Sequence, residues 1–318
     1  MTATTNPNVA GTMTVNANAI FSPAADVVIN NAASQGTITG SGTVRVTRTA
    51  TTPDYLSQYK FTTNTLANLT VDYNSTGSQS ISAINYGGLT ISGARGSSNV
   101  TFPDGGTVGV AGIFNPSATF STGGYLTANN TFVYNGSALQ AAPAFRHAYL
   151  TISNAAGVSM SGDVIVDSTL TLTSGTFTVG ANTLTLNGGP ISGTSTNLSA
   201  GGTSSLVFNS SASGTFIPSN ITTLNNLTVN VQPVSNKLTH NGALTINGTL
   251  TLTDGILDNM PTTADTLFIA STGTVVRANG RIRGALRLYI PTRSPTVYYP
   301  VGGNDLLTPA EIQFNNVT

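Results

Sequence analysis

Short runs of alternating hydrophobic and polar residues recur along this chain, and one stretch shows the pattern most clearly. Residues 163–188 read DVIVDSTLTLTSGTFTVGANTLTLNG, in which Val, Leu and Phe alternate with Thr and Ser between small Gly and Asn residues. Strict period-two alternation interrupted by turn residues is typical of short strands that bury one face. The stretch therefore predicts several short strands joined by tight corners.

Related units occur elsewhere in the sequence. The segment ALTINGTLTLTDGIL, residues 243–257, is a near copy of part of the first stretch. Three longer and looser units share an aromatic residue followed by Asn, a polar stretch and a closing strand that begins with Leu-Thr. They lie at residues 71–93, 132–154 and 206–230. Strand-and-turn units that recur at loose spacing indicate a stacked solenoid whose insertions are absorbed in loops.

We therefore predict an all-β fold, a right-handed parallel β-helix (β-solenoid), over residues 1–280. At about 20 to 25 residues per turn, which is usual for such repeats, residues 10–280 would form roughly a dozen turns. Residues 49–59 (TATTPDYLSQY) interrupt the alternation, and their proline and tyrosines predict a protruding loop or a brief helical turn. The sequence contains no long amphipathic helical pattern, so helix-rich folds are excluded.

Residues 281–318 differ in character from the rest of the chain. Arginines become frequent just before and within this segment, and prolines and tyrosines follow in LYIPTRSPTVYYPVGG, residues 288–303. The final turn of a solenoid needs cover, because an open stack presents unpaired backbone groups. We expect these residues to form a C-terminal β cap or the beginning of an adjoining β-sandwich.

The composition restricts the possible partners. Hydrophobic residues make up 39% of the 318 residues, whereas charged residues make up 7%, against about a quarter in ordinary soluble domains. Eleven basic and eleven acidic residues give zero net charge, so we expect no nucleic-acid partner and no anionic membrane partner. No apolar run approaches the roughly 20 residues of a membrane span. The chain also lacks cysteine, so strand pairing and the core must hold it together without disulfides.

No group of residues has the spacing of a catalytic or metal site. Carbohydrate cleavage, which many β-helix enzymes perform, needs carboxylates gathered on one face. The chain has one glutamate, Glu311, and its aspartates are scattered near predicted corners. His147 and His240 have no acidic or metal-type partner at a suitable spacing, and we expect them on the surface or in loops. We predict no enzymatic activity, no metal and no cofactor.

Two threonine triplets are candidates for a binding surface. Each triplet alternates with leucines that are expected to point inward, so its hydroxyls project from one strand face. The triplets are Thr169, Thr171 and Thr173, and Thr249, Thr251 and Thr253. A flat array of outward threonines suits ice binding, but threonine is also a good strand former on any exposed face. The sequence leaves both interpretations open.

Aromatic residues in the longer units are the other candidates for ligand or interface contacts. Tyr73, Tyr134 and Tyr149 are the main ones, together with Tyr86, Phe145 and Phe208. Exposed rings stack on sugars and anchor interfaces. The same rings can instead close a small core between loops, and the sequence does not decide between the two.

Several of these motifs resemble a known group of proteins. LTISN at residues 150–154, followed by GDVIVDSTLTLTSG at 162–175, resembles the β-helical segments of large bacterial surface proteins exported by the type IX secretion system. The runs SGTVRVTRT (41–49) and QYKFTTNTLANLTVDY (58–73) look like the same group. The tail RGALRLYIPTRSPTVYYPVGG (283–303) resembles the junction into their next domain. The resemblance covers nearly the whole chain.

This resemblance implies an extracellular or cell-surface location and a role in surface structure or adhesion. Members are usually very long, with a signal peptide and a C-terminal sorting domain, so we expect this sequence to be a fragment or a processed product. Their O-glycosylation of Asp-Ser/Thr-hydrophobic sites implies Ser168 and Thr266 as modification sites, and ordinary corner residues give the same pattern.

The function expected from these observations is non-enzymatic. We predict an extracellular structural or adhesive protein, a rigid β-helical stalk or filament subunit on the bacterial surface that associates head to tail as a homo-oligomer. The alternative is a module that binds polysaccharide, such as a surface glycan, or ice. A polysaccharide-active enzyme is the third interpretation.

Overall fold

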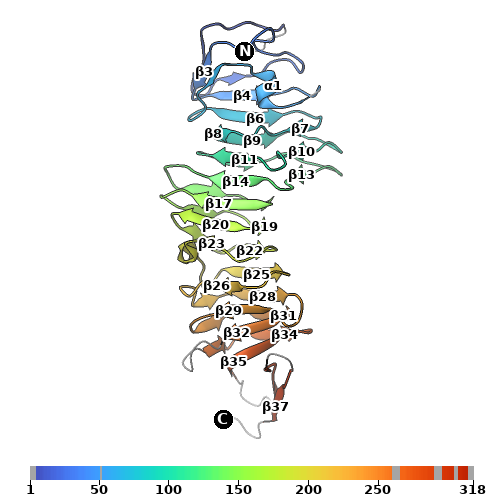
Figure 1. Cartoon of the computed structure of the whole chain (residues 1–318), viewed down its shortest axis with the longest axis vertical. Coiled ribbons are helices and arrows are strands. Elements are labelled where there is room, and N and C mark those ends of the chain that lie inside the picture. Colours follow the sequence, from blue (N-terminus) through green and yellow to red (C-terminus); the bar gives the residue numbers. More distant parts are fainter. Residues whose placement is uncertain (1–4, 51, 260–265, 290–295, 304–306, 314–318) are drawn as a thin grey trace. The chain divides into compact units, whose positions relative to one another are not determined.

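The computed structural model describes residues 5–50, 52–259, 266–289, 296–303 and 307–313 (Figure 1). About 48% of the chain is strand and 2% is helix, and the parallel sheets stack as a β-solenoid of about 12 turns. The predicted all-β solenoid and its number of turns are thus confirmed. The chain divides into two compact units, unit 1 (Met1–Val158) and unit 2 (Ser159–Thr318), which are described separately.

In unit 1 each strand pairs in parallel with the equivalent strand of the next turn. The first sheet contains β1 (Thr12–Val15), β3 (Thr37–Gly40) and β5 (Thr63–Asn64), and the second contains β2 (Ile20–Phe21), β4 (Thr43–Val46), β6 (Thr70–Asn74), β9 (Gly88–Ser92) and β12 (Phe114–Pro116). The third contains β7 (Gln79–Ser80), β10 (Val100–Thr101) and β13 (Tyr125–Leu126), and the fourth contains β8 (Asn85–Tyr86), β11 (Thr107–Val110), β14 (Thr131–Tyr134) and β17 (Tyr149–Ser153). The strands β15 (Gln140–Ala142) and β16 (Phe145–His147) follow β14 along the chain.

The interior of unit 1 is built from side chains in register across successive turns. Phe21, Val44, Val71, Leu89 and Phe114 occupy paired positions of β2, β4, β6, β9 and β12. All five are buried. Because side chains alternate across a strand, this column leaves the intervening polar residues on the outer face. The alternation in the sequence is therefore the direct cause of the stacking.

A single helical turn, α1 (Tyr55–Gln58), follows β4. The carboxylate of Asp54 accepts a hydrogen bond of 2.7 Å from the backbone N–H of Ser57, which caps the turn. The sequence prediction of a brief helical turn within residues 49–59 is confirmed. Tyr55 and Gln58 are buried, so the turn packs into the interior of unit 1.

Unit 2 contains the more regular sheets. One is a seven-stranded sheet that begins with β16 and continues in unit 2 through β19 (Val164–Val166), β22 (Thr183–Leu186), β25 (Ser205–Ser210), β28 (Asn226–Val231), β31 (Thr249–Asp254) and β34 (Thr274–Arg277). Another has the order β26 (Thr215–Ile217), β29 (Lys237–His240), β32 (Ile256–Asn259), β35 (Arg281–Leu288), β33 (Thr266–Ile269), β30 (Leu244–Ile246) and β27 (Thr223–Leu224). Two short parallel pairs join β20 (Leu170–Ser174) to β23 (Ser192–Gly193) and β21 (Phe177–Thr178) to β24 (Leu198–Ser199), and η1 (Ser195–Asn197) is a short 3-10 helix. The chain divides within β18 (Val158–Met160).

The described C-terminal residues add a small antiparallel element. Parallel pairing continues through β35 to Leu288, which is beyond the boundary at residue 280 expected from the sequence. The strands β36 (Thr296–Tyr299) and β37 (Ala310–Gln313) then form an antiparallel pair. The residues that follow β36 bond to Ile282 of β35. The N–H of Ile282 donates to the carbonyl of Pro300, and the N–H of Gly302 donates to the carbonyl of Ile282. This segment thus pairs with β35 at Ile282. The assignment of residues 281–318 to a C-terminal β cap or to the beginning of an adjoining β-sandwich stays a prediction.

Candidate binding surfaces

Columns of polar side chains cover the outer face of the sheet formed by β19, β22, β25, β28, β31 and β34, here called the polar face. One column is a ladder of side-chain hydrogen bonds. Asn187 donates to Asp167 at 2.8 Å, Asn209 donates to Asn187 at 3.1 Å, and Asn230 donates to Asn209 at 2.6 Å. Successive parallel strands lie about 4.8 Å apart, so identical amides on neighbouring turns are within hydrogen-bond reach.

A second column of the polar face combines hydroxyl and amide groups. The carboxylate of Asp163 accepts from the backbone N–H of Thr183, and the amide of Asn226 donates to the hydroxyl of Ser205. The Oγ1 atoms of Thr249 and Thr274 lie 3.2 Å apart. The polar face therefore presents mainly neutral hydrogen-bonding groups, many of which already bond to one another.

The two threonine triplets lie in different sheets. Thr171 belongs to β20 and pairs with Ser192 of β23, whereas Thr249 and Thr251 belong to β31 in the polar face. Thr173 is exposed, and Thr169 and Thr251 are half-buried. The two triplets therefore do not combine into one flat array.

Within the polar face the threonine column is also interrupted. Thr185, Val207, Thr228 and Thr251 occupy successive paired positions, so a valine breaks the row of hydroxyls. Thr253 has no partner in β28, because a bulge pairs Asn230 with Asp254 instead. Thr185 and Thr228 were not identified from the sequence, although their alternation with Leu and Val was visible there.

Tyr73 and Tyr134 are fully buried, so the interpretation of these two rings as a ligand surface is wrong. The Tyr73 hydroxyl lies 2.9 Å from that of Tyr86 and accepts a hydrogen bond of 3.0 Å from the N–H of Ser82. Burial raises the pKa of the Tyr73 and Tyr134 hydroxyls. Of the three main candidates, only Tyr149 is half-buried and retains some exposure.

Both histidines are buried, which contradicts their expected location on the surface or in loops. The Nδ1 atom of His240 lies 3.0 Å from the carbonyl oxygen of Gly242, and its Nε2 atom lies 3.1 Å from that of Ile221. The ring of His147 packs against Phe132 and Phe145, with centroids 4.9 Å apart in each case. Both imidazoles serve the packing of the interior.

The two predicted O-glycosylation positions are both half-buried. Ser168 precedes β20, and its backbone carbonyl lies against Gly188, where a side chain would collide with it. Thr266 begins β33, and the preceding Asp265 lies outside the described residues. Modification at Ser168 and Thr266 stays a prediction.

Two buried glutamines bond to the backbone in the same way, which was not predicted from the sequence. The side-chain amide of Gln79 donates to the carbonyls of Val46 and Arg48, and that of Gln140 donates to the carbonyls of Val110 and Gly112. Each amide thus donates to two backbone carbonyls of an earlier turn. Burying these carbonyls without a hydrogen bond would cost free energy. The isolated glutamines in the insertion-bearing units were the available signal.

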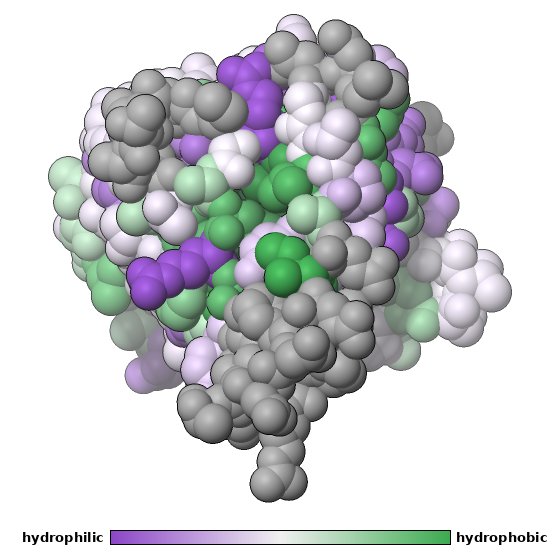
Figure 2. All heavy atoms as spheres, turned by 90° about the horizontal axis from the view of Figure 1, so that it is seen from below, coloured by the Kyte–Doolittle hydropathy of each residue, from purple (hydrophilic) through white to green (hydrophobic). Residues whose placement is uncertain are grey.

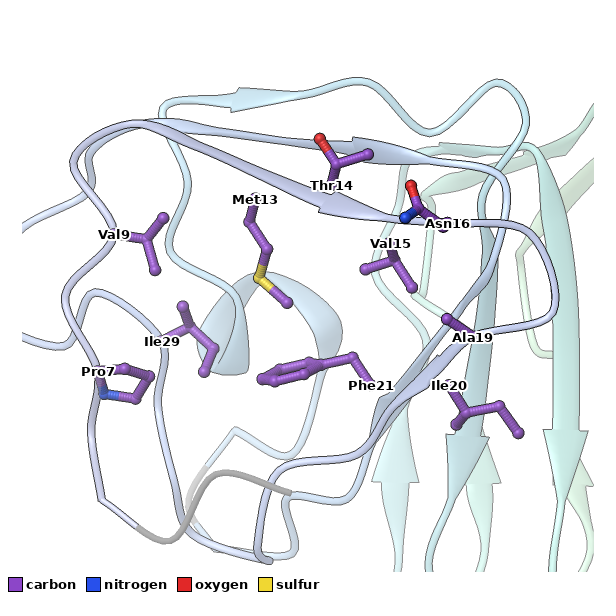
Figure 3. Close-up of a pocket in the computed structure, with 10 residues that line it drawn as sticks. All are labelled: Pro7, Val9, Met13, Thr14, Val15, Asn16, Ala19, Ile20, Phe21 and Ile29. Atoms are coloured by element: carbon purple, nitrogen blue, oxygen red, sulfur yellow. The ribbon is translucent and has the colours of Figure 1, made fainter. Parts of the chain in front are cut away.

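The first turn of unit 1 leaves the end of its hydrophobic interior open. A cavity of about 430 Å³ is lined by apolar side chains that include Met13, Val15, Phe21 and Ile29. Met13, Phe21 and Ile29 point toward one another into this space (Figure 3). Among the described residues, β1 pairs only with β3, so the other edge of β1 carries unpaired backbone groups.

The last turns of unit 2 leave a smaller and more polar opening, whose lining also includes Arg277. A cavity of about 300 Å³ is lined by residues that include Ile269, Val275, Leu288 and Tyr289. Figure 2, which views the molecule from below, shows hydrophobic residues gathered at the middle of that face with hydrophilic residues around them. In the described part of the chain β34 pairs only with β31, so its other edge is also unpaired.

Acidic and metal-binding side chains do not gather in the structure. No group of three or more His, Cys, Asp or Glu residues is close enough to hold a metal ion within the described ranges. Asp258, which is largely buried, lies 3.1 Å from Arg283 and 3.7 Å from Lys237, and these ion pairs balance its charge. No described helix is long and apolar enough to cross a membrane.

Comparison with other proteins identifies no relative. No family model, no curated protein and no solved structure matches this chain.

Proposed function

We propose that the chain is a non-enzymatic structural module of an extracellular or cell-surface bacterial protein, in which stacked turns provide a rigid support. The observation that carries the proposal is the unbroken hydrophobic column of unit 2. Val164, Leu184, Leu206, Leu227 and Leu250 pair in register across successive strands and are all buried. Each turn is thus fixed to the next by both backbone hydrogen bonds and side-chain packing.

Composition and resemblance support the location outside the cell. Only 7% of the residues are charged and none is cysteine, so a neutral coat of Ser, Thr and Asn faces the surroundings. The motifs that resemble type IX-secreted surface proteins favour the same location. A structural or adhesive role follows from this combination of stacked turns and neutral surface.

The module associates end to end with a second copy in this proposal. The first turn offers the free edge of β1 beside an apolar cavity, and the last turns offer the free edge of β34 beside a second cavity, whose lining includes Arg277 and Tyr298 as well as apolar residues. Strand edges that end a parallel stack can pair with another edge of the same kind. A head-to-tail contact of this type would bury both openings and produces filaments when it repeats.

Sedimentation at increasing protein concentration, with electron microscopy of the same samples, tests this proposal. We expect linear oligomers that become longer as concentration rises. Met13→Asp places a charge in the apolar cavity and should abolish assembly, whereas Thr12→Asp, on an exposed position of the same strand, should leave assembly intact. A monomer at every concentration, or equal loss in both variants, would contradict end-to-end association.

A further inference from the structure

A cleft on the outer side of unit 2 has the chemistry of a saccharide subsite. It has a volume of about 400 Å³ and lies over β26 and β29, beside η1. Its lining includes Phe216 and Thr239 from the two strands, Ser195 from η1, and Ser219 and Asn241 from the adjoining turns. None of the described residues that line it is charged.

The strands place an aromatic ring beside a hydroxyl in this cleft. Phe216 of β26 pairs directly with Thr239 of β29, so the two side chains project from neighbouring turns on the same face. Phe216 is half-buried, while Ile217 and Pro218 behind it are buried. An aromatic ring with one accessible side can stack on the apolar face of a sugar ring, with neighbouring hydroxyl and amide groups to bond its hydroxyls.

Hydrogen bonds fix the walls of the cleft. The Thr239 hydroxyl donates to the carbonyl of Thr215 at 3.1 Å, which orients this side chain and leaves its oxygen able to accept. The amide of Asn220 donates to the carbonyls of Leu198 and Thr196, at 2.9 and 3.2 Å, and so ties the turn after β26 to η1. A preformed site avoids the entropic cost of ordering its walls on binding.

The charged side chains near the cleft lie on β29 and on the strands that follow it, and they pair with one another. Thr239 of β29 pairs with Asp258 of β32, and Asp258 pairs in turn with Arg283 of β35. The ion pairs of Asp258 with Arg283 and Lys237 engage these groups with one another. Neither cation lines the cleft, whose described lining residues are all uncharged, so we expect the cleft to favour a neutral sugar over an acidic one.

We propose that this cleft binds a neutral saccharide, with Phe216 as the stacking platform and Thr239, Ser219 and Asn241 as hydrogen-bonding groups. A volume of about 400 Å³ lies within the range of small-molecule sites. The inference is independent of end-to-end assembly, because none of the residues that line the two end cavities belongs to the cleft.

The test uses saturation-transfer NMR and titration calorimetry with the full chain. The probes are gluco-, manno-, galacto- and xylo-oligosaccharides, and oligomers of uronic acids of the same lengths. We expect saturation transfer to at least one neutral series and none to the uronates. Phe216→Ala should weaken binding at least tenfold, which corresponds to about 1.4 kcal/mol, and Phe216→Tyr should retain it.

Phe268→Ala is the matched control, because Phe268 is also a half-buried phenylalanine of unit 2, located on β33 beneath the guanidinium of Arg287. This variant should bind as the wild-type protein does. Thr239→Val, which keeps the side-chain shape, should weaken binding severalfold and serves if Phe216→Ala does not fold. Absence of binding to every neutral series, preference for uronates, or equal loss in Phe268→Ala would overturn the proposal.

Discussion

The interiors of the two units are filled by different chemistry. In unit 1, buried tyrosine hydroxyls bond to one another and to the backbone: Tyr73 to Tyr86 at 2.9 Å, and Tyr59 to the carbonyl of Arg45 at 2.6 Å. In unit 2, the buried side chains are mostly Leu, Val and Ile in register. The same stacking of parallel strands thus accommodates a polar aromatic interior and an aliphatic one.

The difference shows which interactions define the solenoid. The backbone ladder sets the spacing of the turns, and the interior must only be filled without leaving polar atoms unpaired. Unit 1 meets the second condition only in part: Arg95 donates to the carbonyls of Tyr73 and Gly77 and to the side chain of Gln79, whereas its Nε atom and the buried Tyr134 hydroxyl have no hydrogen-bond partner among the described residues. We therefore expect the units to respond differently to pH and to substitution.

Alkaline pH should produce the largest difference between the units. Burial raises the pKa of several tyrosines, all in unit 1: Tyr55, Tyr59, Tyr73, Tyr86 and Tyr134. Because the unfolded pKa is about 10, each contributes stability that is fully present below pH 10 and is lost at about 1.4 kcal/mol per pH unit above it. Hydrogen exchange with mass spectrometry between pH 9 and 12 should show unit 1 opening before unit 2. Simultaneous opening, or earlier opening of unit 2, would contradict this expectation.

Truncation of the aliphatic column should have the next largest effect. Leu227→Ala removes a fully buried side chain between Leu206 and Leu250, and we expect a loss of about 2 to 5 kcal/mol in the free energy of unfolding of unit 2. Thr228→Ala, at the adjacent outward position, should cost less than about 1 kcal/mol. Chemical denaturation followed by circular dichroism measures both. Similar losses in the two variants would show that the column is not the main stabilising feature.

Removal of one amide from the ladder should have the smallest effect. Asn209→Ala breaks the bonds to Asn187 and Asn230 on an exposed position, so we expect a loss of about 0.5 to 1.5 kcal/mol. Thr203→Ala, also exposed and in unit 2 but outside the ladder, is the control and should change little. A loss above about 3 kcal/mol would place the ladder beside the aliphatic column in importance.

The sequence predicted the fold because period-two alternation determines which side chains face inward. The same alternation also predicts that two of the aromatic residues are buried, although they were interpreted as candidates for a ligand surface. Tyr73 and Tyr134 lie two residues after Val71 and Phe132, so each shares the inward face of its strand. The same rule places His240, two residues after Leu238, in the interior.

Alternation of hydrophobic and polar residues does not predict features that depend on how the turns are joined. The cleft around Phe216 assembles residues from several turns, and its existence depends on corner geometry that alternation does not encode. The assignment of the two threonine triplets to different sheets depends on the same corners. The glutamine amides bind carbonyls of earlier turns, so only the three-dimensional stacking reveals their role.

Two glycines allow side chains to reach past an intervening turn. Asn135 donates to Asn85 at 2.8 Å across Gly109, where a Cβ atom would lie 2.2 Å from the Asn85 oxygen. Asn247 donates to the carbonyl of Gly202 at 3.4 Å, and a Cβ atom at Gly202 would lie 2.9 Å from that amide. In a solenoid whose repeats contact only their neighbours, stability is approximately the sum of the intrinsic stability of each repeat and of the interfaces between adjacent repeats. These second-neighbour bonds add a coupling across three turns, so a turn that frays also loses a contact with the turn beyond its neighbour.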